Sequence, residues 1–117
     1  MKKSKVVLYE GMYIFRAALN DLAKKQALTK ALDLIQLLGG STEKVIDWGR
    51  RKLAYAMKGS YEGHYYLLYF LLPSHQMDEL IRENRLNEDL LRFMHVLSES
   101  VPDGDKITFK PLVEAEK

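Results

Sequence analysis

Residues 48–72, WGRRKLAYAMKGSYEGHYYLLYFLL, decide the fold of this chain, because they form two strand-like runs joined by a short loop that contains glycine. Alternate residues of a strand point to opposite faces of a sheet, and in the second run both sets are apolar or aromatic. Both faces of this hairpin must therefore be covered. The chain's own helices can cover one face, and a partner is the expected cover of the other. Three consecutive cations, Arg50, Arg51 and Lys52, lie beside the aromatic residues and favour RNA as a partner.

Strand and helix patterns extend over most of the chain on either side of this hairpin. Strands are predicted at residues 5–15, 41–58, 64–72 and 90–97, and helices at residues 19–38 and 75–85. Gly39 and Gly40 end the first helix, and Gly49 marks a bulge or bend in the second strand. The order β-α-β-β-α-β predicts a ferredoxin-like α+β fold, a four-stranded antiparallel sheet with two helices on one face. We expect this domain to span residues 1–98, with an extended C-terminal tail over residues 99–117.

The face of the sheet away from the helices is predicted to be open. Strand alternation directs two sets of residues toward the helices: Leu53, Tyr55 and Met57 on one strand, and Tyr66, Leu68, Phe70 and Leu72 on the next. The same alternation directs Tyr65, Leu67, Tyr69 and Leu71 outward. A contiguous apolar patch of this kind rarely stays exposed in a soluble monomer, so we expect a partner to cover it. The alternative is that the tail, which contains Phe109 among other apolar residues, folds back over the patch.

The charge and composition exclude several classes of protein. The net charge is +2, but residues 1–58 hold most of the cations and residues 59–117 most of the acidic residues, so one surface is expected to meet an anionic partner. There is no cysteine and no apolar run long enough for a membrane span, so we expect a cytoplasmic protein without a membrane partner. The three histidines have no neighbouring ligands at metal-binding spacing, and no glycine-rich phosphate loop is present. We expect no cofactor, no metal, no small-molecule substrate and no enzymatic activity.

One enzymatic hypothesis uses the same topology. An acylphosphatase-like hydrolase would bind an anion with Arg16, in the connection between the first strand and the first helix. The segment FRAALND has no glycine that would let consecutive amides close around a phosphate, so this hypothesis is disfavoured.

Several segments together resemble the bacterial small-subunit ribosomal protein six family. They are Tyr9-Glu10, Gly39-Gly40, the run WGRRKLAY at residues 48–55, EGHY at residues 62–65 and RLNEDLLR at residues 85–92. The resemblance covers residues 5–98. It implies a non-enzymatic protein of the small ribosomal subunit that pairs with ribosomal protein eighteen, the pair binding the central domain of small-subunit ribosomal RNA.

The resemblance also implies site residues. Arg51, Lys52 and Arg92 match basic positions of the family and are the candidates for RNA contact, with Arg50 as a weaker candidate. Tyr9 is a further RNA candidate, because a tyrosine ring can stack on an unpaired base. The candidates for contact with ribosomal protein eighteen are Tyr65, Leu67, Tyr69, Leu71 and Phe109.

The alternative function is a free-standing module that binds single-stranded RNA. In that case tyrosines of the sheet would stack on bases, and the candidates are Tyr9, Tyr13, Tyr55 and Tyr61, although Tyr55 is better explained as a core residue. The chain lacks the K/R-G-F/Y-G/A-F-V-x-F/Y motif that such modules carry.

Overall fold

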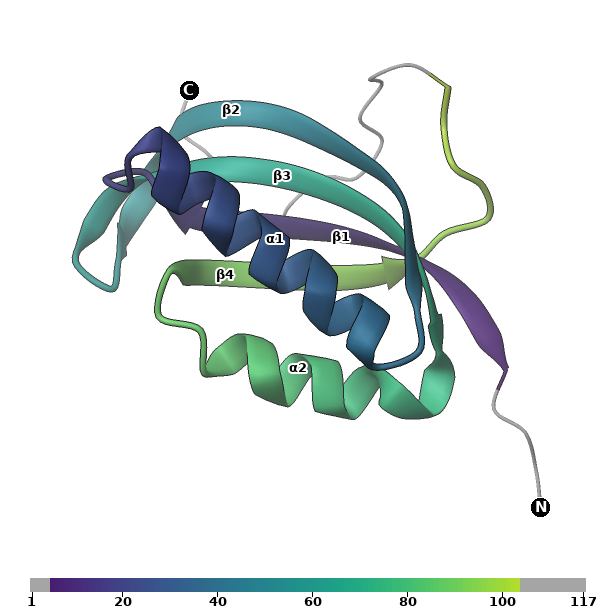
Figure 1. Cartoon of the computed structure of the whole chain (residues 1–117). Helices are drawn as coiled ribbons and strands as arrows, with labels where there is room; N and C mark the ends of the chain where they lie inside the picture. Colours follow the sequence, from purple (N-terminus) through teal and green to yellow (C-terminus); the bar gives the residue numbers. More distant parts are fainter. Residues whose placement is uncertain (1–4, 104–117) are drawn as a thin grey trace.

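The computed structural model describes residues 5–103, and its elements follow the predicted order (Figure 1). In chain order they are β1 (Val6–Arg16), α1 (Asp21–Leu37), β2 (Ser41–Met57), β3 (Ser60–Pro73), the 3-10 turn η1 (Ser74–Gln76), α2 (Met77–Arg85) and β4 (Leu90–Leu97). The four strands form one sheet in the order β2-β3-β1-β4, and all neighbouring strands are antiparallel. The predicted ferredoxin-like α+β fold is confirmed.

The first helix begins and ends where the local chemistry favours it. The side-chain oxygen of Asn20 accepts a hydrogen bond of 2.8 Å from a backbone N–H three residues later, which satisfies one of the free donors at the helix start. Gly39, with φ +93°, takes the left-handed conformation that ends the helix. Ala27, Ala31 and Ile35 are spaced four residues apart, so they form one buried stripe that faces the sheet.

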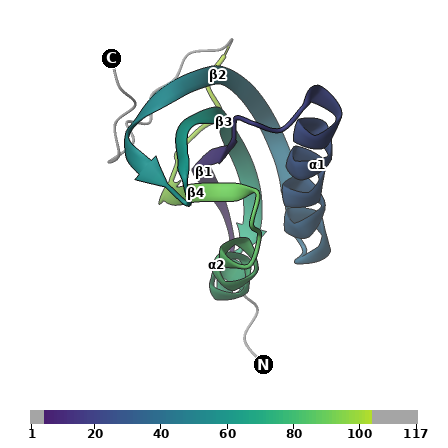
Figure 2. The same cartoon turned by 90° about the vertical axis from the view of Figure 1, so that its left-hand side faces the viewer.

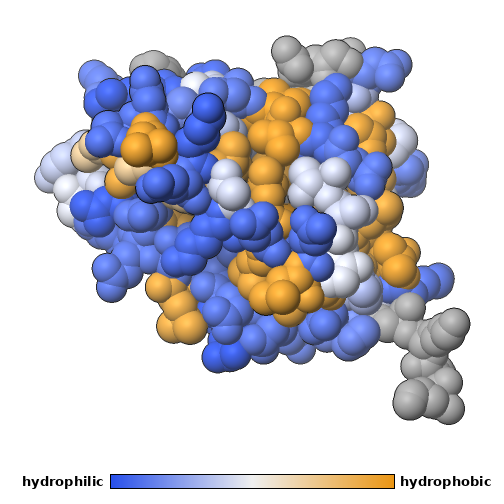
Figure 3. All heavy atoms as spheres, in the orientation of Figure 1, coloured by the Kyte–Doolittle hydropathy of each residue, from blue (hydrophilic) through white to orange (hydrophobic). Residues whose placement is uncertain are grey.

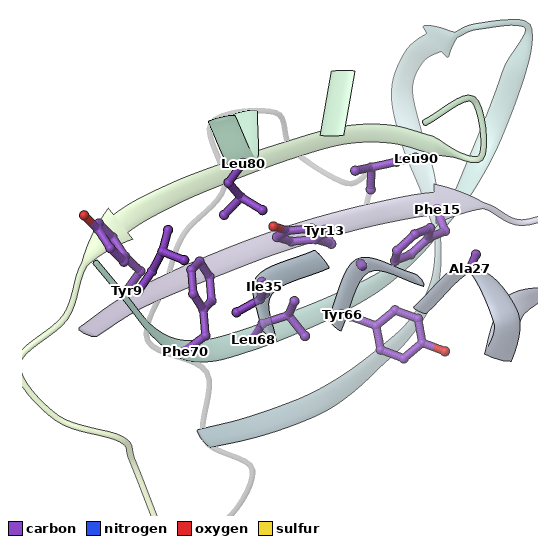
Figure 4. Close-up of a cluster of buried hydrophobic side chains, with 12 residues drawn as sticks. Tyr9, Tyr13, Phe15, Ala27, Ile35, Tyr66, Leu68, Phe70, Leu80 and Leu90 are labelled. Atoms are coloured by element: carbon purple, nitrogen blue, oxygen red, sulfur yellow. The ribbon is translucent and has the colours of Figure 1, made fainter. Parts of the chain in front are cut away.

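Both helices pack on the same face of the sheet, over a core of aromatic and aliphatic side chains (Figure 4). This helix-side core consists of Tyr9, Tyr13, Phe15, Ala27, Ala31, Ile35, Tyr66, Leu68, Phe70, Leu72, Leu80 and Leu90. The predicted inward residues of β3, from Tyr66 to Leu72, all belong to it. The side chain of Asn84 on α2 donates a 2.9 Å hydrogen bond to the hydroxyl of Tyr13 on β1, and this bond fixes the second helix to the centre of the sheet.

The long strand β2 changes direction at Gly49. This residue has φ +88°, and the pairing of β2 with β3 shifts between Asp47 and Gly49, as expected for the predicted bulge. Figure 2 shows β2 as an arch that passes over β3, with its end close to β4. At that end, the Nζ of Lys58 donates a 3.1 Å hydrogen bond to the carbonyl oxygen of Leu90. The second half of β2 therefore covers part of the sheet face away from the helices.

A second core fills the space under this arch. This far-side core consists of Met12, Ile14, Ile46, Leu53, Met57, Tyr65, Leu67, Tyr69 and Leu91, with Trp48, Met94 and Val101 packed against it. The segment after β4 joins it: the N–H of Ser98 donates to the carbonyl of Leu8 at 3.0 Å, and Lys44 Nζ donates to the carbonyl of Pro102 at 2.9 Å. The chain itself thus covers much of the sheet face away from the helices.

The prediction of an open sheet face is wrong. Tyr65 and Leu67 are 0% exposed and Tyr69 is 1% exposed, whereas Leu71 is partly exposed. They point away from the helices as predicted, but Tyr65, Leu67 and Tyr69 are buried in the far-side core. The alternative was that the tail folds back over the patch. Among the first tail residues, Val101 does so, because it packs against the far-side core.

The predicted facing of β2 is wrong as well. Leu53 and Met57 pack in the far-side core and not against the helices, and Tyr55 is 55% exposed and not a core residue. Beyond the bend at Gly49 the strand turns over the sheet, so its inward residues meet the opposite face. Phe109 lies outside the described residues.

Candidate nucleic-acid interface

The candidate cations Arg51 and Arg92 lie on the same face of the sheet. In an antiparallel sheet, residues directly opposite each other point to the same side. Arg92 of β4 is opposite Ile14, a residue of the far-side core. Arg51 of β2 is opposite Gly63, and a Cβ on Gly63 would point at the Cγ2 of Ile14, 2.4 Å away. Both arginines therefore belong to the face away from the helices.

Arg51 is held by an aromatic ring. Its guanidinium carbon lies 4.2 Å from the centre of the Trp48 ring, which is a cation–π contact. Trp48 in turn meets Tyr65 edge-on, with ring centres 5.5 Å apart. The far-side core thus fixes the indole, and the indole fixes the guanidinium. Trp48 is a site residue that the sequence reasoning missed. Its position three residues before Arg51 could have indicated a contact between the ring and the guanidinium.

Neither Arg51 nor Arg92 is neutralised within the described part of the chain. The Nε of each is buried and finds no hydrogen-bond partner among residues 5–103, and no acidic side chain of that range forms an ion pair with either. A buried donor without a partner costs roughly 1–3 kcal/mol, and a guanidinium stays charged at every physiological pH. The fold therefore presents two positive charges that an anionic ligand can neutralise.

Arg50 and Lys52 differ from these two arginines. They alternate with Arg51 along β2, so they point to the other face of the strand. The Nε of Arg50 forms an ion pair with a carboxylate oxygen of Glu62 at 2.6 Å. Lys52 is exposed and stands opposite the same Glu62 in the strand pairing. Of the four candidate cations, Arg51 and Arg92 thus belong to the far side of the sheet, and Arg50 and Lys52 do not.

The burial of Tyr9 argues against its stacking on a base. Tyr9 is 8% exposed and belongs to the helix-side core, where its ring stacks on Phe70 with centres 5.6 Å apart. A ring covered in this way has no free face for a base. Tyr13 is fully buried in the same core. The exposed tyrosines are Tyr55 and Tyr61, both in the β2–β3 hairpin.

The candidate partner residues lie mostly beneath the surface. Of the outward set of β3, only Leu71 reaches the surface in part. Three further apolar side chains on the same face are partly or largely exposed, namely Met94, Val96 and Val101. The sequence reasoning missed these three residues, because it assigned the patch to one strand.

The helix-covered side of the molecule shows a mixed polar and apolar surface (Figure 3). Arg82 on α2 is paired with Glu79 at 2.6 Å and with Glu83 at 3.0 Å. These ion pairs raise the pKa of Arg82 and lower that of Glu79.

Among residues 5–103 no group of three or more histidine and acidic side chains could hold a metal ion. No helix in the same range is both long and apolar enough to cross a membrane.

Comparison with known proteins agrees with the resemblance seen in the sequence. The family model of ribosomal protein S6 matches residues 8–96. The chain is 45% identical over 103 residues to the small ribosomal subunit protein bS6 of Chlamydia muridarum, across 88% of this chain and 92% of that protein. The protein of the same name from Chlamydia trachomatis serovar D is also 45% identical over 103 residues, with the same coverage of both chains.

A solved structure gives the same result in three dimensions. The crystal structure of 30S ribosomal protein S6 from Thermotoga maritima superposes with a TM-score of 0.73 at 25% sequence identity, covering 80% of this chain and 89% of that chain. The chain therefore belongs to the ribosomal protein S6 family, which is a family of structural proteins and not of enzymes, as the sequence predicted.

Proposed function

We propose that this protein is a structural component of the small ribosomal subunit, where it binds the central domain of small-subunit ribosomal RNA together with ribosomal protein eighteen. The relatives from two Chlamydia species carry the name of a small-subunit protein, and the family resemblance implies the RNA domain and the protein partner. The observation that carries the RNA-binding part is the pair of unneutralised guanidinium groups, Arg51 and Arg92, on one face of the sheet.

This geometry suits RNA backbone better than a small anion. Lys and Arg side chains neutralise phosphates and release condensed counterions, so each contact adds affinity without reading the sequence. Two or three such contacts give weak binding by the protein alone. A second protein that supplies further cations is therefore part of the proposal. Affinity should fall with salt, with a slope of about 0.7–0.9 per phosphate contact.

We place ribosomal protein eighteen on the apolar rim of the far-side core. Leu71, Met94 and Val96 reach the surface there, and the exposed fraction of Val96 is 40%. The predicted partner residues Tyr65, Leu67 and Tyr69 are buried beneath this rim and support it. Phe109 remains a candidate of the proposed contact.

The free-standing single-strand module is less well supported. Stacking on the sheet requires exposed rings on its central strands, and Tyr9 and Tyr13 on β1 are covered by the helices. The same covering does not affect Arg51 or Arg92, which act on the opposite face.

The proposal is tested by titrating a central-domain fragment of small-subunit ribosomal RNA with the protein, in the presence of ribosomal protein eighteen. Arg92→Gln should lower the affinity about tenfold, because it removes one charge-assisted contact to phosphate. It should also reduce the salt slope by about 0.7–0.9. Arg82→Gln is the matched control, because Arg82 is exposed on α2 and already paired with two glutamates. Equal affinities of wild type and Arg92→Gln at every salt concentration would contradict the proposal.

The same titration separates the two functions. The assembly protein should bind the central-domain fragment far more tightly when ribosomal protein eighteen is present. A free-standing module should bind a short unstructured oligonucleotide tightly without a second protein.

A further inference from the structure

We propose that the tip of the β2–β3 hairpin, residues 52–61, is a second RNA contact, at which the ring of Tyr55 stacks on an unpaired base. The inference rests on the proposed function in that the ligand is RNA. It goes beyond that function because it assigns the contact to a different side chain, which binds RNA by base stacking and not by charge alone.

The hairpin tip is anchored to the body of the protein. Leu53 and Met57 are 7% and 9% exposed and pack into the far-side core. Lys58 and Gly59 form the turn with φ values of +48° and +80°, and Lys58 Nζ bonds to the carbonyl of Leu90. Because the tip is already ordered, little conformational entropy is lost when a ligand binds to it.

The anchoring residues force the side chains between them outward. Leu53 and Met57 point into the core, and the three residues between them, Ala54, Tyr55 and Ala56, are all exposed. Alanine is too small to cover a neighbouring ring. Tyr55, with an exposed fraction of 55%, is therefore a large ring flanked by small residues, which leaves it accessible to a planar ligand.

Tyr61 stands on the other arm of the same tip. Its exposed fraction is 73%, and the strand pairing jumps from Lys52–Glu62 to Met57–Ser60, so Tyr61 lies opposite the bulged segment that carries Tyr55. One short irregular hairpin thus holds two of the most exposed aromatic side chains of the described structure.

The charge around these rings favours a nucleic acid over a protein. Residues 50–62 contain two arginines, two lysines and one acidic residue, Glu62, which pairs with Arg50. Lys52 and Lys58, three residues on either side of Tyr55, are exposed. A lysine ammonium has three donors, so the single bond of Lys58 to a carbonyl leaves donors for a phosphate. The apolar residues of the tip that could anchor a protein interface, Leu53 and Met57, are buried inside the molecule.

The chemistry selects an unpaired base. A base inside a double helix has both faces covered by its neighbours, whereas a base in a loop or bulge can stack on a tyrosine ring. Such stacking tolerates every base, because all four have a π-face, and flanking cations hold the backbone on either side.

The test uses a fluorescently labelled oligouridylate of about twelve nucleotides, at low ionic strength, with the full chain alone. The wild type should bind weakly. Tyr55→Ala should weaken binding roughly tenfold, whereas Tyr55→Phe, which keeps the ring, should stay within about twofold of the wild type. Leu86→Ala, a truncation of another exposed apolar side chain at the end of α2, is the control. An oligonucleotide of the same length and charge without bases should bind as weakly as Tyr55→Ala.

Equal binding by the wild type and Tyr55→Ala would overturn the inference, and so would equal binding of the oligonucleotides with and without bases. If Tyr55→Ala instead weakens the pairing with ribosomal protein eighteen in the absence of RNA, the ring contacts protein and the inference also fails. Unfolding curves of Tyr55→Ala and Tyr61→Ala show whether any loss reflects unfolding, and Tyr61→Ala gives a second, independent reading of the tip. The proposed function is tested by Arg92→Gln with the central-domain fragment, so either idea can fail while the other stands.

Discussion

His95 should make the stability of this protein depend on pH between about pH 6.5 and pH 4. The residue lies on β4 opposite Gly11, with the rings of Tyr13 and Phe70 each centred 5.5 Å from its own. Burial lowers the pKa of His95 from 6.5 to about 4, because the charged imidazolium would lose its hydration.

The hydrogen bonds around His95 favour the same protonation state. The Tyr13 hydroxyl lies 2.8 Å from His95 Nε2, and it accepts a hydrogen bond from Asn84 Nδ2. Its single proton is therefore free to point at Nε2, which requires a neutral imidazole with the proton on Nδ1. A protonated His95 would bring a second donor toward Tyr13. Burial also raises the pKa of Tyr13, so its hydroxyl keeps this proton.

The sign follows from the lowered pKa. A group that is harder to protonate in the folded state stabilises the fold fully above its unfolded pKa of 6.5, and this contribution is lost as the pH falls toward 4. The complete shift corresponds to roughly 3 kcal/mol, and about 2 kcal/mol of it should be lost between pH 7.5 and pH 5.0.

Urea unfolding at these two pH values measures the effect. His95→Gln keeps an acceptor for Tyr13 but cannot titrate, so its free energy of unfolding should fall by about 2 kcal/mol less than that of the wild type. His75→Gln, which replaces an exposed histidine of η1, is the control for removing a histidine outside the core. If His95→Gln and the wild type lose the same free energy of unfolding over this interval, the reasoning is refuted. An NMR titration that places the pKa of His95 near 6.5 would refute it as well.

Two further predictions concern the far side of the sheet. Gly63→Ala should destabilise the protein by about 1–3 kcal/mol in urea unfolding, because its Cβ would lie 2.4 Å from Cγ2 of the buried Ile14. Gly59→Ala has open space around its Cβ and should cost only the left-handed strain of about 1–2 kcal/mol, so a larger loss at Gly59 than at Gly63 would be inconsistent with this packing. Tyr69→Phe removes the hydroxyl that donates to the buried carboxylate of Glu10 and should cost about 1–3 kcal/mol, while an unchanged unfolding midpoint would show that this bond contributes nothing net.

Much of the architecture follows from local sequence patterns. The spacing of Ala27, Ala31 and Ile35 and the glycines that follow define the first helix. The alternation in β3 correctly separates the residues that face the helices from those that do not. These predictions succeed because periodicity and turn chemistry act over a few residues, and the neighbours that decide them are adjacent in the chain. Arg51 and Arg92 could also be chosen as candidates from local sequence, because each is a charged residue inside a predicted strand.

The cover of the far side of the sheet was decided only by the tertiary structure. Both faces of β3 are apolar, so each must be covered. Local sequence patterns do not indicate whether a partner or the chain itself covers the second face. The bend at Gly49 sends β2 back over the sheet, so Leu53 and Met57 bury the residues expected to be exposed and Tyr55 is turned outward. The face that each residue points to follows from strict alternation along a regular strand. A bulge adds an unpaired residue and bends the strand, so the facing of the residues beyond it depends on how distant strands pack. The sequence by itself therefore determined which residues alternate, and the folded chain determined which side each alternating set meets.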